Sequence, residues 1–444
     1  MMIKRIVMGI CLSMVWTYVA VSAPTITCRV DTDRTVLPAG QEEKAVVKIT
    51  VDAAEAPPLT KRTPVNVSLV LDRSSSMGGQ KIEQARLAAL EAVRRLHPDD
   101  VVSVVTYDSV VETMVPAQPA ARNKDWIEEQ IQRINPRGST ALFGGVSQGA
   151  AELRKYIESS YNHRMILLSD GIANVGPSSP AELARLGASL LKEQIHVSTV
   201  GIGLGYNEDL MTDLAREGGG NTHFVEDAGD LARIISSELG EAHQVVARRV
   251  VVEVELPDGI EPVRIIGRTG QITKNKIEIP LHQLQGGQSR YALVEVTVPP
   301  QSAEQKIEVA RARVSYDDLL EQAPRQSEII VAEVEFSVQR EVVESSVVPD
   351  VQKEIAINVL AEAKDEAVRL ADEGRRQEAS QVLRDAAVGA QRVGGQHNFD
   401  DLLMEADVAV EQAETVREQG LDSRSRKSLR ASSYQKIMQQ KEVE

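Results

Sequence analysis

The chain has 444 residues, a length that corresponds to two to four domains at roughly 100 to 200 residues each. Phe, Trp and Tyr together make up only 3% of it, and the formal net charge is −15. Such a chain lacks both the aromatic platforms and the basic grooves that bind single-stranded nucleic acid, and its surface would repel a phosphate backbone. Composition therefore excludes nucleic acid as the expected partner and predicts a largely aliphatic core.

Residues 1–23 are predicted to be a secretory signal peptide. Lys4 and Arg5 precede an apolar run over 6–21, and Val21-Ser22-Ala23 offers the small residues of a cleavage site. Cleavage after Ser22 and an uncleaved anchor are the alternatives, although about 16 apolar residues are short against the ~20 that span a bilayer. Without Lys4 and Arg5 the net charge deepens from −15 to −17. We expect an exported protein, periplasmic, secreted or in the cell envelope, with no stable membrane span after cleavage.

Residues 24–60 are predicted to be an N-terminal β segment. The β-branched runs at Arg29–Thr32 and Ala45–Val51 are separated by the turn signal Pro38-Ala39-Gly40. Because Cys11 leaves with the signal peptide, Cys28 is then the single cysteine, so we expect no disulfide framework and a small buried thiol.

Residues 61–240 show buried apolar runs that alternate with helical periodicity, such as the stripe from Ile82 to Leu96. This alternation is typical of an α/β fold with a doubly wound, mostly parallel, Rossmann-like sheet. The predicted parallel strands are Val65–Leu71, Val101–Tyr107, Arg164–Ser169, His196–Ile202 and Asn221–Val225, with Val110–Val115 as an antiparallel edge strand.

The remaining residues divide into three predicted parts. Residues 241–341 hold antiparallel strand patterns and are expected to form a flanking β-sandwich, completed by residues 24–60, although two separate small sheets also fit. Residues 350–419 carry alanine-rich helical stripes interrupted at Gly374 and predict a C-terminal helical hairpin or bundle; the spacing after Gly374 also resembles half of a tetratricopeptide repeat, but no second copy follows. Residues 420–444 are predicted to be a basic mobile tail.

Three polar clusters follow predicted strands of the α/β region. Asp72, Ser74 and Ser76 come after the first strand, Thr140 begins a helix, and Asp170 follows a later strand. Because ligands bind beyond the carboxyl ends of such strands, these side chains are expected to converge. They offer carboxylate and hydroxyl oxygens without nitrogen or sulfur, a set that suits a hard divalent cation such as Mg²⁺. The alternative is that the first cluster only caps a helix.

These residues resemble the metal-ion-dependent adhesion site of von Willebrand factor type A domains, in the form found in exported bacterial proteins. The D-x-S-x-S motif matches Asp72, Ser74 and Ser76, the separate threonine matches Thr140, and the later aspartate matches Asp170. The resemblance covers residues 61–240 and implies that the cation is Mg²⁺, or Mn²⁺ or Ca²⁺, and that it bridges to an acidic residue of a partner protein. Ser75 stands where many bacterial members have glycine.

Other motifs point to enzymes but lack the context that those enzymes need. Gly145–Gly149 matches the G-x-S-x-G nucleophile elbow around Ser147, yet a helix pattern begins before it, and the elbow requires a strand there. Gly201–Gly205 lacks the third glycine of a dinucleotide fingerprint, and Ser74 stands where a phosphoryl-transfer enzyme needs a second acid.

We therefore expect a non-enzymatic, adhesion-type protein that binds a partner's Asp or Glu carboxylate through the cation. The alternative is a structural or assembly component of an envelope complex that is recognised through its C-terminal helices, with the metal only ordering loops. A Mg²⁺-dependent hydrolase is the third hypothesis.

Overall fold

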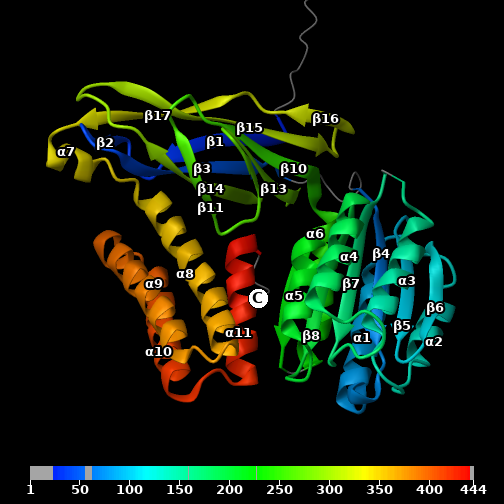
Figure 1. Cartoon of the computed structure of the whole chain (residues 1–444). Helices are drawn as coiled ribbons and strands as arrows, with labels where there is room; N and C mark the ends of the chain where they lie inside the picture. The colour runs from blue at the N-terminus through cyan, green and yellow to red at the C-terminus, as the bar shows by residue number, and fades with distance from the viewer. Residues whose placement is uncertain (1–23, 56–62, 159, 227, 441–444) are drawn as a thin grey trace, which may run out of the picture.

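The structure is a computed structural model that describes residues 24–55, 63–158, 160–226 and 228–440. The predicted signal peptide, residues 1–23, lies outside the described residues. Figure 1 shows an α/β domain, a β-sandwich and a group of C-terminal helices. Within the described ranges, no helix combines the length and the apolar character needed to cross a membrane.

The α/β domain is built on a six-stranded sheet in the order β6-β5-β4-β7-β8-β9. β4 pairs in parallel with β5 on one side and β7 on the other, and only β6 runs antiparallel to its neighbour. This is the doubly wound, mostly parallel sheet that the sequence predicts, and the strand order reverses at β4. The strands are β4 (Val65–Asp72), β5 (Val101–Tyr107), β6 (Val111–Pro119), β7 (Asn162–Ser169), β8 (Ile195–Ile202) and β9 (Gly219–Val225).

Helices cover both faces of this sheet, which is why β4, β5, β7 and β8 are buried throughout and read as continuous apolar runs. One face packs against α1 (Gln80–Arg95), α2 (Lys124–Gln132) and α6 (Leu231–His243). The other packs against α3 (Leu142–Arg154), α4 (Pro180–Lys192) and α5 (Glu208–Glu217). The short turns η2 (Ser75–Met77) and η3 (Ala228–Asp230) precede α1 and α6.

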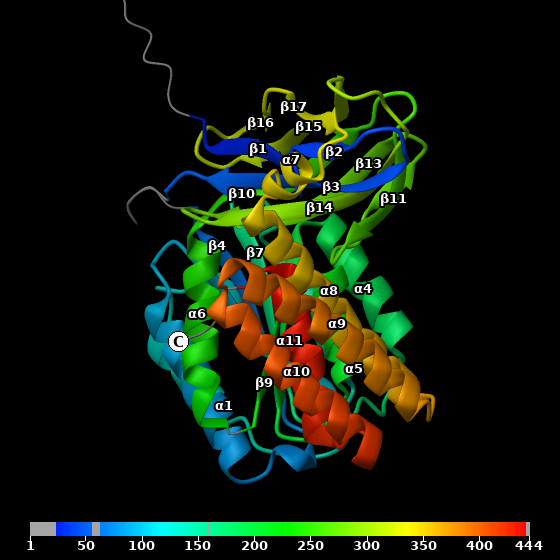
Figure 2. The same cartoon turned by 90° about the vertical axis from the view of Figure 1, so that its left-hand side faces the viewer.

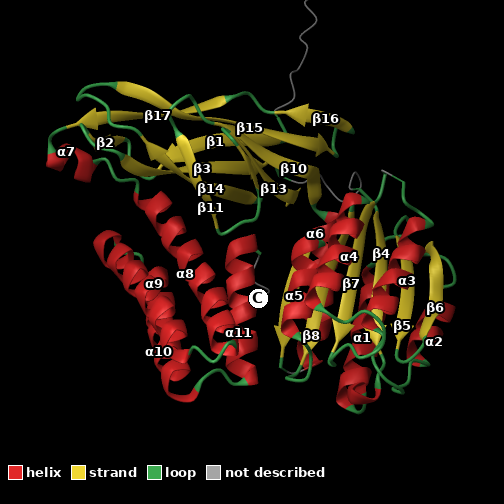
Figure 3. Cartoon of the chain, in the orientation of Figure 1, coloured by secondary structure: helices red, strands yellow, loops and turns green. Residues whose placement is uncertain are grey.

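Two further sheets pack around one aliphatic core and form a β-sandwich (Figure 3). One has the order β1-β3-β14-β11, and the other β12-β13-β10-β15-β17-β2, with β16 paired to β15. Strands that precede the α/β domain pair with strands that follow it, β3 with β14 and β2 with β17. Their bounds are β1 (Ile26–Thr32), β2 (Val36–Pro38), β3 (Glu43–Ala53), β10 (Val245–Glu255), β11 (Glu261–Ile266), β12 (Gln271–Thr273), β13 (Lys276–Gln285), β14 (Ser289–Val298), β15 (Lys306–Asp318), β16 (Ala323–Gln326) and β17 (Ile330–Ser337).

The C-terminal helices pack through an alanine-rich seam. Ala379, Ala387, Ala406 and Ala409 are buried between them, and small side chains of this kind let helices approach closely. Gly374, at a positive φ of 79°, makes the turn between the first two long helices. The helices are α7 (Arg340–Ser345), α8 (Pro349–Asp372), α9 (Arg376–His397), α10 (Asp400–Gln419) and α11 (Ser423–Met438).

The prediction of a basic mobile tail over 420–444 is wrong for the part that the structure describes. α11 lies between α8 and the α/β domain, as Figures 1 and 2 both show. Lys427 pairs with Glu208 of α5, and the buried Tyr434 donates its hydroxyl hydrogen to the Gly220 carbonyl oxygen at 2.7 Å. The basic residues are therefore used to dock the helix onto acidic neighbours. Residues 441–444 lie outside the described ranges.

Candidate metal centre

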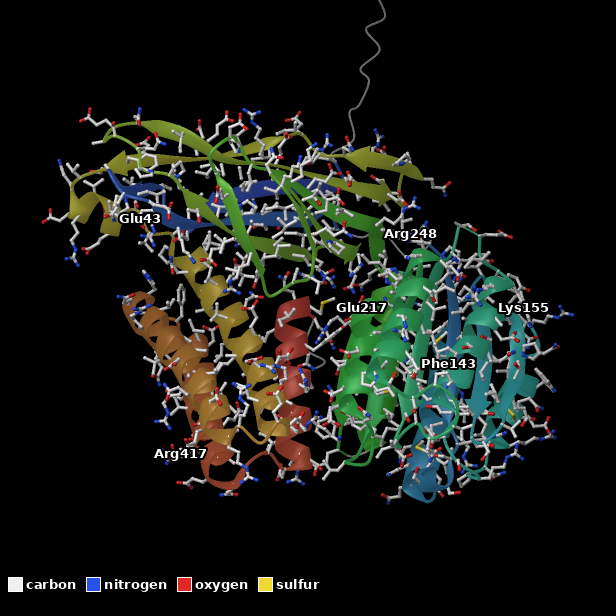
Figure 4. All side chains as sticks on the ribbon, in the orientation of Figure 1. Glu43, Phe143, Lys155, Glu217, Arg248 and Arg417 are labelled. Carbon is white, nitrogen blue, oxygen red and sulfur yellow. The ribbon has the colours of Figure 1, made fainter. Side chains whose placement is uncertain are left out.

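The candidate site lies at the carboxyl ends of the central strands, away from the β-sandwich. β4 ends at Asp72, β7 ends one residue before Asp170, and Thr140 lies just before α3. The sandwich contacts the opposite end of the sheet, where Arg248 (labelled in Figure 4) donates to the Tyr161 carbonyl oxygen at 2.9 Å. The site is thus at the topological switch point, where open α/β sheets bind ligands.

The two serines and the two aspartates of the prediction are joined by short hydrogen bonds. Ser76 Oγ donates to Asp170 Oδ1 at 2.7 Å and lies 3.0 Å from Ser74 Oγ. The Ser74 N–H donates to Asp72 Oδ1 at 2.8 Å, and Ser169 Oγ donates to Asp72 Oδ2 at 2.7 Å. The strand end and the following loop therefore hold both carboxylates in fixed orientations.

Thr140 comes to the same point from a third segment. A Cβ atom placed on Gly171 would lie 3.3 Å from Thr140 Oγ1, 3.4 Å from Ser76 Oγ and 3.9 Å from Asp72 Oδ2. Three oxygens, two from the end of β4 and the loop after it and one from the segment before α3, thus surround a space that the absence of a side chain at Gly171 leaves open. Asn174, which the sequence did not indicate, braces the loop by accepting the Thr140 N–H on Oδ1 at 2.9 Å.

In the comparison with known proteins, residues 66–237 match the family model of the von Willebrand factor type A domain. The chain contains a von Willebrand factor type A domain. Domains of this family mediate contacts between proteins.

Curated relatives match the chain at low identity. An uncharacterised protein of Synechocystis is 26% identical over 76% of this chain and 80% of its own length. Inter-alpha-trypsin inhibitor heavy chain H3 of Rattus norvegicus is 26% identical over 44% of this chain, which matches only 22% of that protein.

Solved structures extend the similarity in fold to nearly the whole chain. A von Willebrand factor type A protein from Catenulispora acidiphila has a TM-score of 0.71 at 18% identity, covering 92% of this chain and 96% of that one. The ArnB paralog VWA2 from Sulfolobus acidocaldarius has a TM-score of 0.61 at 16% identity, covering 93% and 98%. At these identities the likeness concerns the fold alone.

The charges at the type A site are buried and only partly compensated. Asp72 and Asp170 are nearly inaccessible to solvent, and burial raises the pKa of Asp72 to about 6. Lys81, near the start of α1, forms an ion pair through Nζ with Asp170 Oδ2. Lys81 thus compensates the charge of Asp170, whereas both oxygens of Asp72 accept hydrogen bonds from neutral groups. Sequence reasoning missed Lys81, since a lysine five residues after the motif carries no distinguishing pattern.

A partly buried network of charges flanks the type A site and fixes its loops. Asp108 Oδ2 accepts hydrogen bonds from Arg73 Nε at 2.7 Å and from Arg137 Nε at 2.9 Å. The Arg137 N–H also donates to the Arg73 carbonyl oxygen at 2.7 Å. The Ser75 hydroxyl donates to the Gly138 carbonyl oxygen at 3.0 Å, so the serine in place of glycine ties the motif loop to the segment that carries Thr140.

The donor chemistry fits a hard divalent cation. Within the residues that the structure describes, no group of three or more His, Cys, Asp or Glu side chains is placed to hold a metal ion. The type A site instead combines two carboxylates with three hydroxyls, and oxygen-only sets of this kind suit Mg²⁺ and Ca²⁺.

Ser147 of the G-x-S-x-G match lies inside α3, not on a strand-to-helix elbow. Its hydroxyl donates to the Phe143 carbonyl oxygen at 2.8 Å, so it is engaged by its own helix. The flanking glycines have a packing role, because a Cβ atom on Gly145 would lie 2.5 Å from the Tyr107 ring and one on Gly149 would lie 2.6 Å from Val70. The motif therefore reflects close contact between α3 and the sheet.

Proposed function

We propose that this is an exported, non-enzymatic protein that binds a partner protein through a divalent cation at its type A domain. The observation that carries the proposal is the convergence of oxygens from Thr140, Ser76 and Asp72 on the space beside Gly171. Mg²⁺ is the preferred ion, with Mn²⁺ or Ca²⁺ as substitutes, because every donor is a hard oxygen. The predicted signal peptide supports export.

The hydrogen bonds support different roles for the site residues. Asp72 already accepts hydrogen bonds on both carboxylate oxygens, which suits a residue that orients the site. The hydroxyls of Ser74, Ser76 and Thr140 would hold the ion directly, as the family resemblance implies, while Asp170 acts through Ser76. An Asp or Glu carboxylate of the partner would complete the coordination shell.

The charge of the chain sets how such a partner would bind. A net charge of −15 opposes the approach of an acidic partner, so the attraction must come from the bound cation at short range. We therefore expect partner binding to require the metal and to depend on the partner's carboxylate itself.

Calorimetric titration of residues 24–444 with MgCl₂, MnCl₂ and CaCl₂ tests the metal. Thr140→Val removes a donor at nearly constant shape, and Gly171→Val fills the space; each should weaken Mn²⁺ binding by about 10-fold or more. Ser147→Ala is the matched control, since its hydroxyl serves only its helix. Wild-type Mn²⁺ affinity in both site variants would contradict the proposal.

The bridging role needs a second measurement. Water-proton relaxation of the Mn²⁺-loaded protein should change on addition of a peptide with a single Asp and stay constant with its Asn counterpart. EDTA should abolish the response. A response equal for both peptides would argue against a carboxylate bridge.

The second candidate, an assembly component recognised through the C-terminal helices, is favoured by exposed apolar side chains on α9 and α10. Val388 is 54% exposed, Met404 69% and Val408 51%. If this face binds the partner, Met404→Glu should abolish capture while EDTA leaves it unchanged, whereas the metal-bridged hypothesis predicts the reverse.

A further inference from the structure

A cavity of about 310 Å³ lies where the type A domain, the β-sandwich and the C-terminal helices meet. We call it the junction cavity. Figures 1 and 2 show α5, α8 and α11 close together below the sandwich at this place. Its walls include Arg216 at the end of α5, Arg268 and His282 from the sandwich, Arg369 on α8, and Arg430 and Met438 on α11.

Arg268 is the buried cation of this cavity. It is 8% exposed; its Nε donates to the Tyr291 carbonyl oxygen at 3.2 Å and its Nη2 to the Met438 carbonyl oxygen at 3.3 Å. No Asp or Glu among the described residues forms an ion pair with it. Burial and the positive charge of Arg290 lower the pKa of Arg268 to about 9. A guanidinium buried without a counter-ion is costly by several kcal/mol.

The surroundings of Arg268 add to the surplus of positive charge. Arg290 donates through Nη1 to the Leu281 carbonyl oxygen at 3.0 Å, and its buried Nε has no hydrogen-bond partner within the described structure. Glu241 attracts Arg290, but that carboxylate already accepts hydrogen bonds from Asn221 and Gln285.

The carboxylates in the cavity wall are occupied by other arginines. Asp365 pairs with Arg430 at 3.1 Å and Arg216 at 3.6 Å. Glu366 pairs with Arg369 at 2.5 Å, and Glu362 pairs with Arg264 at 2.7 Å. The wall has four arginines and three acids, and none of the three carboxylates forms an ion pair with Arg268.

We propose that the junction cavity binds a small anion through a phosphate or carboxylate group held by Arg268. A guanidinium presents paired N–H donors that match both groups, and a buried site strengthens such charge-assisted hydrogen bonds. The volume is at the lower end of the range for small-molecule sites and fits a metabolite-sized ligand. The bound anion would contact all three parts of the chain and hold them in one arrangement. The inference is independent of the proposed cation bridge, since none of the residues of the metal site lines this cavity.

Calorimetry and thermal unfolding of residues 24–444 with sodium phosphate and, separately, sodium citrate test this inference, with sodium chloride at equal ionic strength as the reference. We expect a saturable heat and a rise in Tm with at least one of the two anions, unchanged by EDTA. A response to phosphate alone or to citrate alone identifies which group the site takes. No saturable response to either anion overturns the proposal.

Two substitutions locate the site. Arg268→Met should weaken anion binding at least 10-fold, and without anion its Tm should equal or exceed that of the wild type, because an uncompensated buried charge is gone. Arg340→Gln is the matched control, since Arg340 is a surface arginine with an 88% exposed side chain, and it should bind as the wild type does. Anion binding by Arg268→Met at wild-type affinity contradicts the assignment.

Hydrogen exchange on the wild type gives the answer even if Arg268→Met fails to fold. Phosphate or citrate should slow amide exchange in the segments 267–269 and 437–438, which line the cavity. Exchange that slows elsewhere but not in these segments would contradict the proposal.

Discussion

The regions next to the two ends of α5 contain buried charges of opposite sign. Before its N-terminal end, Gly205 packs so closely that a Cβ atom would lie 2.8 Å from the Asp170 carbonyl oxygen, and there Lys81 forms an ion pair with Asp170, one of two buried carboxylates. At its C-terminal end, Arg216 lines the junction cavity, where Arg268 lacks an ion pair with any described acid. In each region a buried charge is compensated only in part within the described residues, and its sign predicts the sign of the ligand that binds there.

The largest expected effect is a loss of Mn²⁺ affinity at the type A site that leaves the junction cavity unchanged. Asp170→Ala removes the carboxylate that accepts the Ser76 hydroxyl and the Lys81 ammonium, so Mn²⁺ affinity should fall on the order of 100-fold. The response to phosphate or citrate should stay that of the wild type, as calorimetry would show. A parallel loss of both would mean that the two ends of α5 do not act independently.

Low pH should lower the folding stability through His282, which lines the junction cavity. Burial and the charges of Arg268 and Arg290 lower the pKa of His282 to about 3, below its unfolded value of about 6.5. The neutral imidazole therefore contributes stability that is complete above pH 6.5 and is lost as the pH falls toward 3, by at most about 1.4 kcal/mol per pH unit.

His282→Asn isolates this effect. Asparagine tolerates the positive φ of 64° at this position and does not titrate in this range. Urea unfolding between pH 7.5 and 4.5 should show a shallower loss of stability for the variant than for the wild type. Identical slopes of unfolding free energy against pH in the two proteins would show that the neighbouring arginines do not lower the pKa of His282.

Lys81→Met tests how the charge of Lys81 affects cation binding beside Asp170. The positive charge of Lys81 beside Asp170 disfavours a cation in the site, so its removal should raise Mn²⁺ affinity by about 10-fold, equivalent to about 1.4 kcal/mol. Without metal the variant should unfold more easily, because two buried carboxylates then lack a counter-ion. Lys124→Met, on the surface helix α2, is a suitable control. A drop in Mn²⁺ affinity for Lys81→Met would contradict the prediction and make Lys81 part of the cation site.

The smallest effect concerns the helix that closes the junction. Tyr434→Phe removes the hydrogen bond to the Gly220 carbonyl oxygen and should lower the free energy of unfolding by about 1 kcal/mol. Hydrogen exchange in α11 should accelerate more than exchange in α9. Equal acceleration in both helices would show that α11 does not detach from the α/β domain independently of the other C-terminal helices.

The grouping of the five candidate metal ligands could be predicted because their positions follow from local sequence patterns. Asp72, Ser74 and Ser76 share one loop, and Asp170 and Thr140 also lie at strand ends or helix starts, which a parallel sheet brings to one edge. The roles of Lys81 and Gly171 could not be predicted, since they depend on the path of α1 and on the space between three loops.

The docking of α11 and the junction cavity could not be predicted, because both depend on contacts between residues that are far apart in the sequence. The basic residues of α11 suggest a solvated tail, but Arg426 meets Asp209, 217 positions earlier in the chain. Arg268, Arg216 and Arg430 come from three parts of the molecule, and no spacing in the sequence relates them.

The insertion of the type A domain into the sandwich has a mechanical consequence. β3 leads into β4 and α6 leads into β10, so two covalent connections leave the domain at the end opposite the metal site. A partner that pulls on the cation would load both connections in parallel, while α11 adds a third, non-covalent attachment through Lys427 and Tyr434. Such a pull would reach β3 and β10, which belong to different sheets of the sandwich.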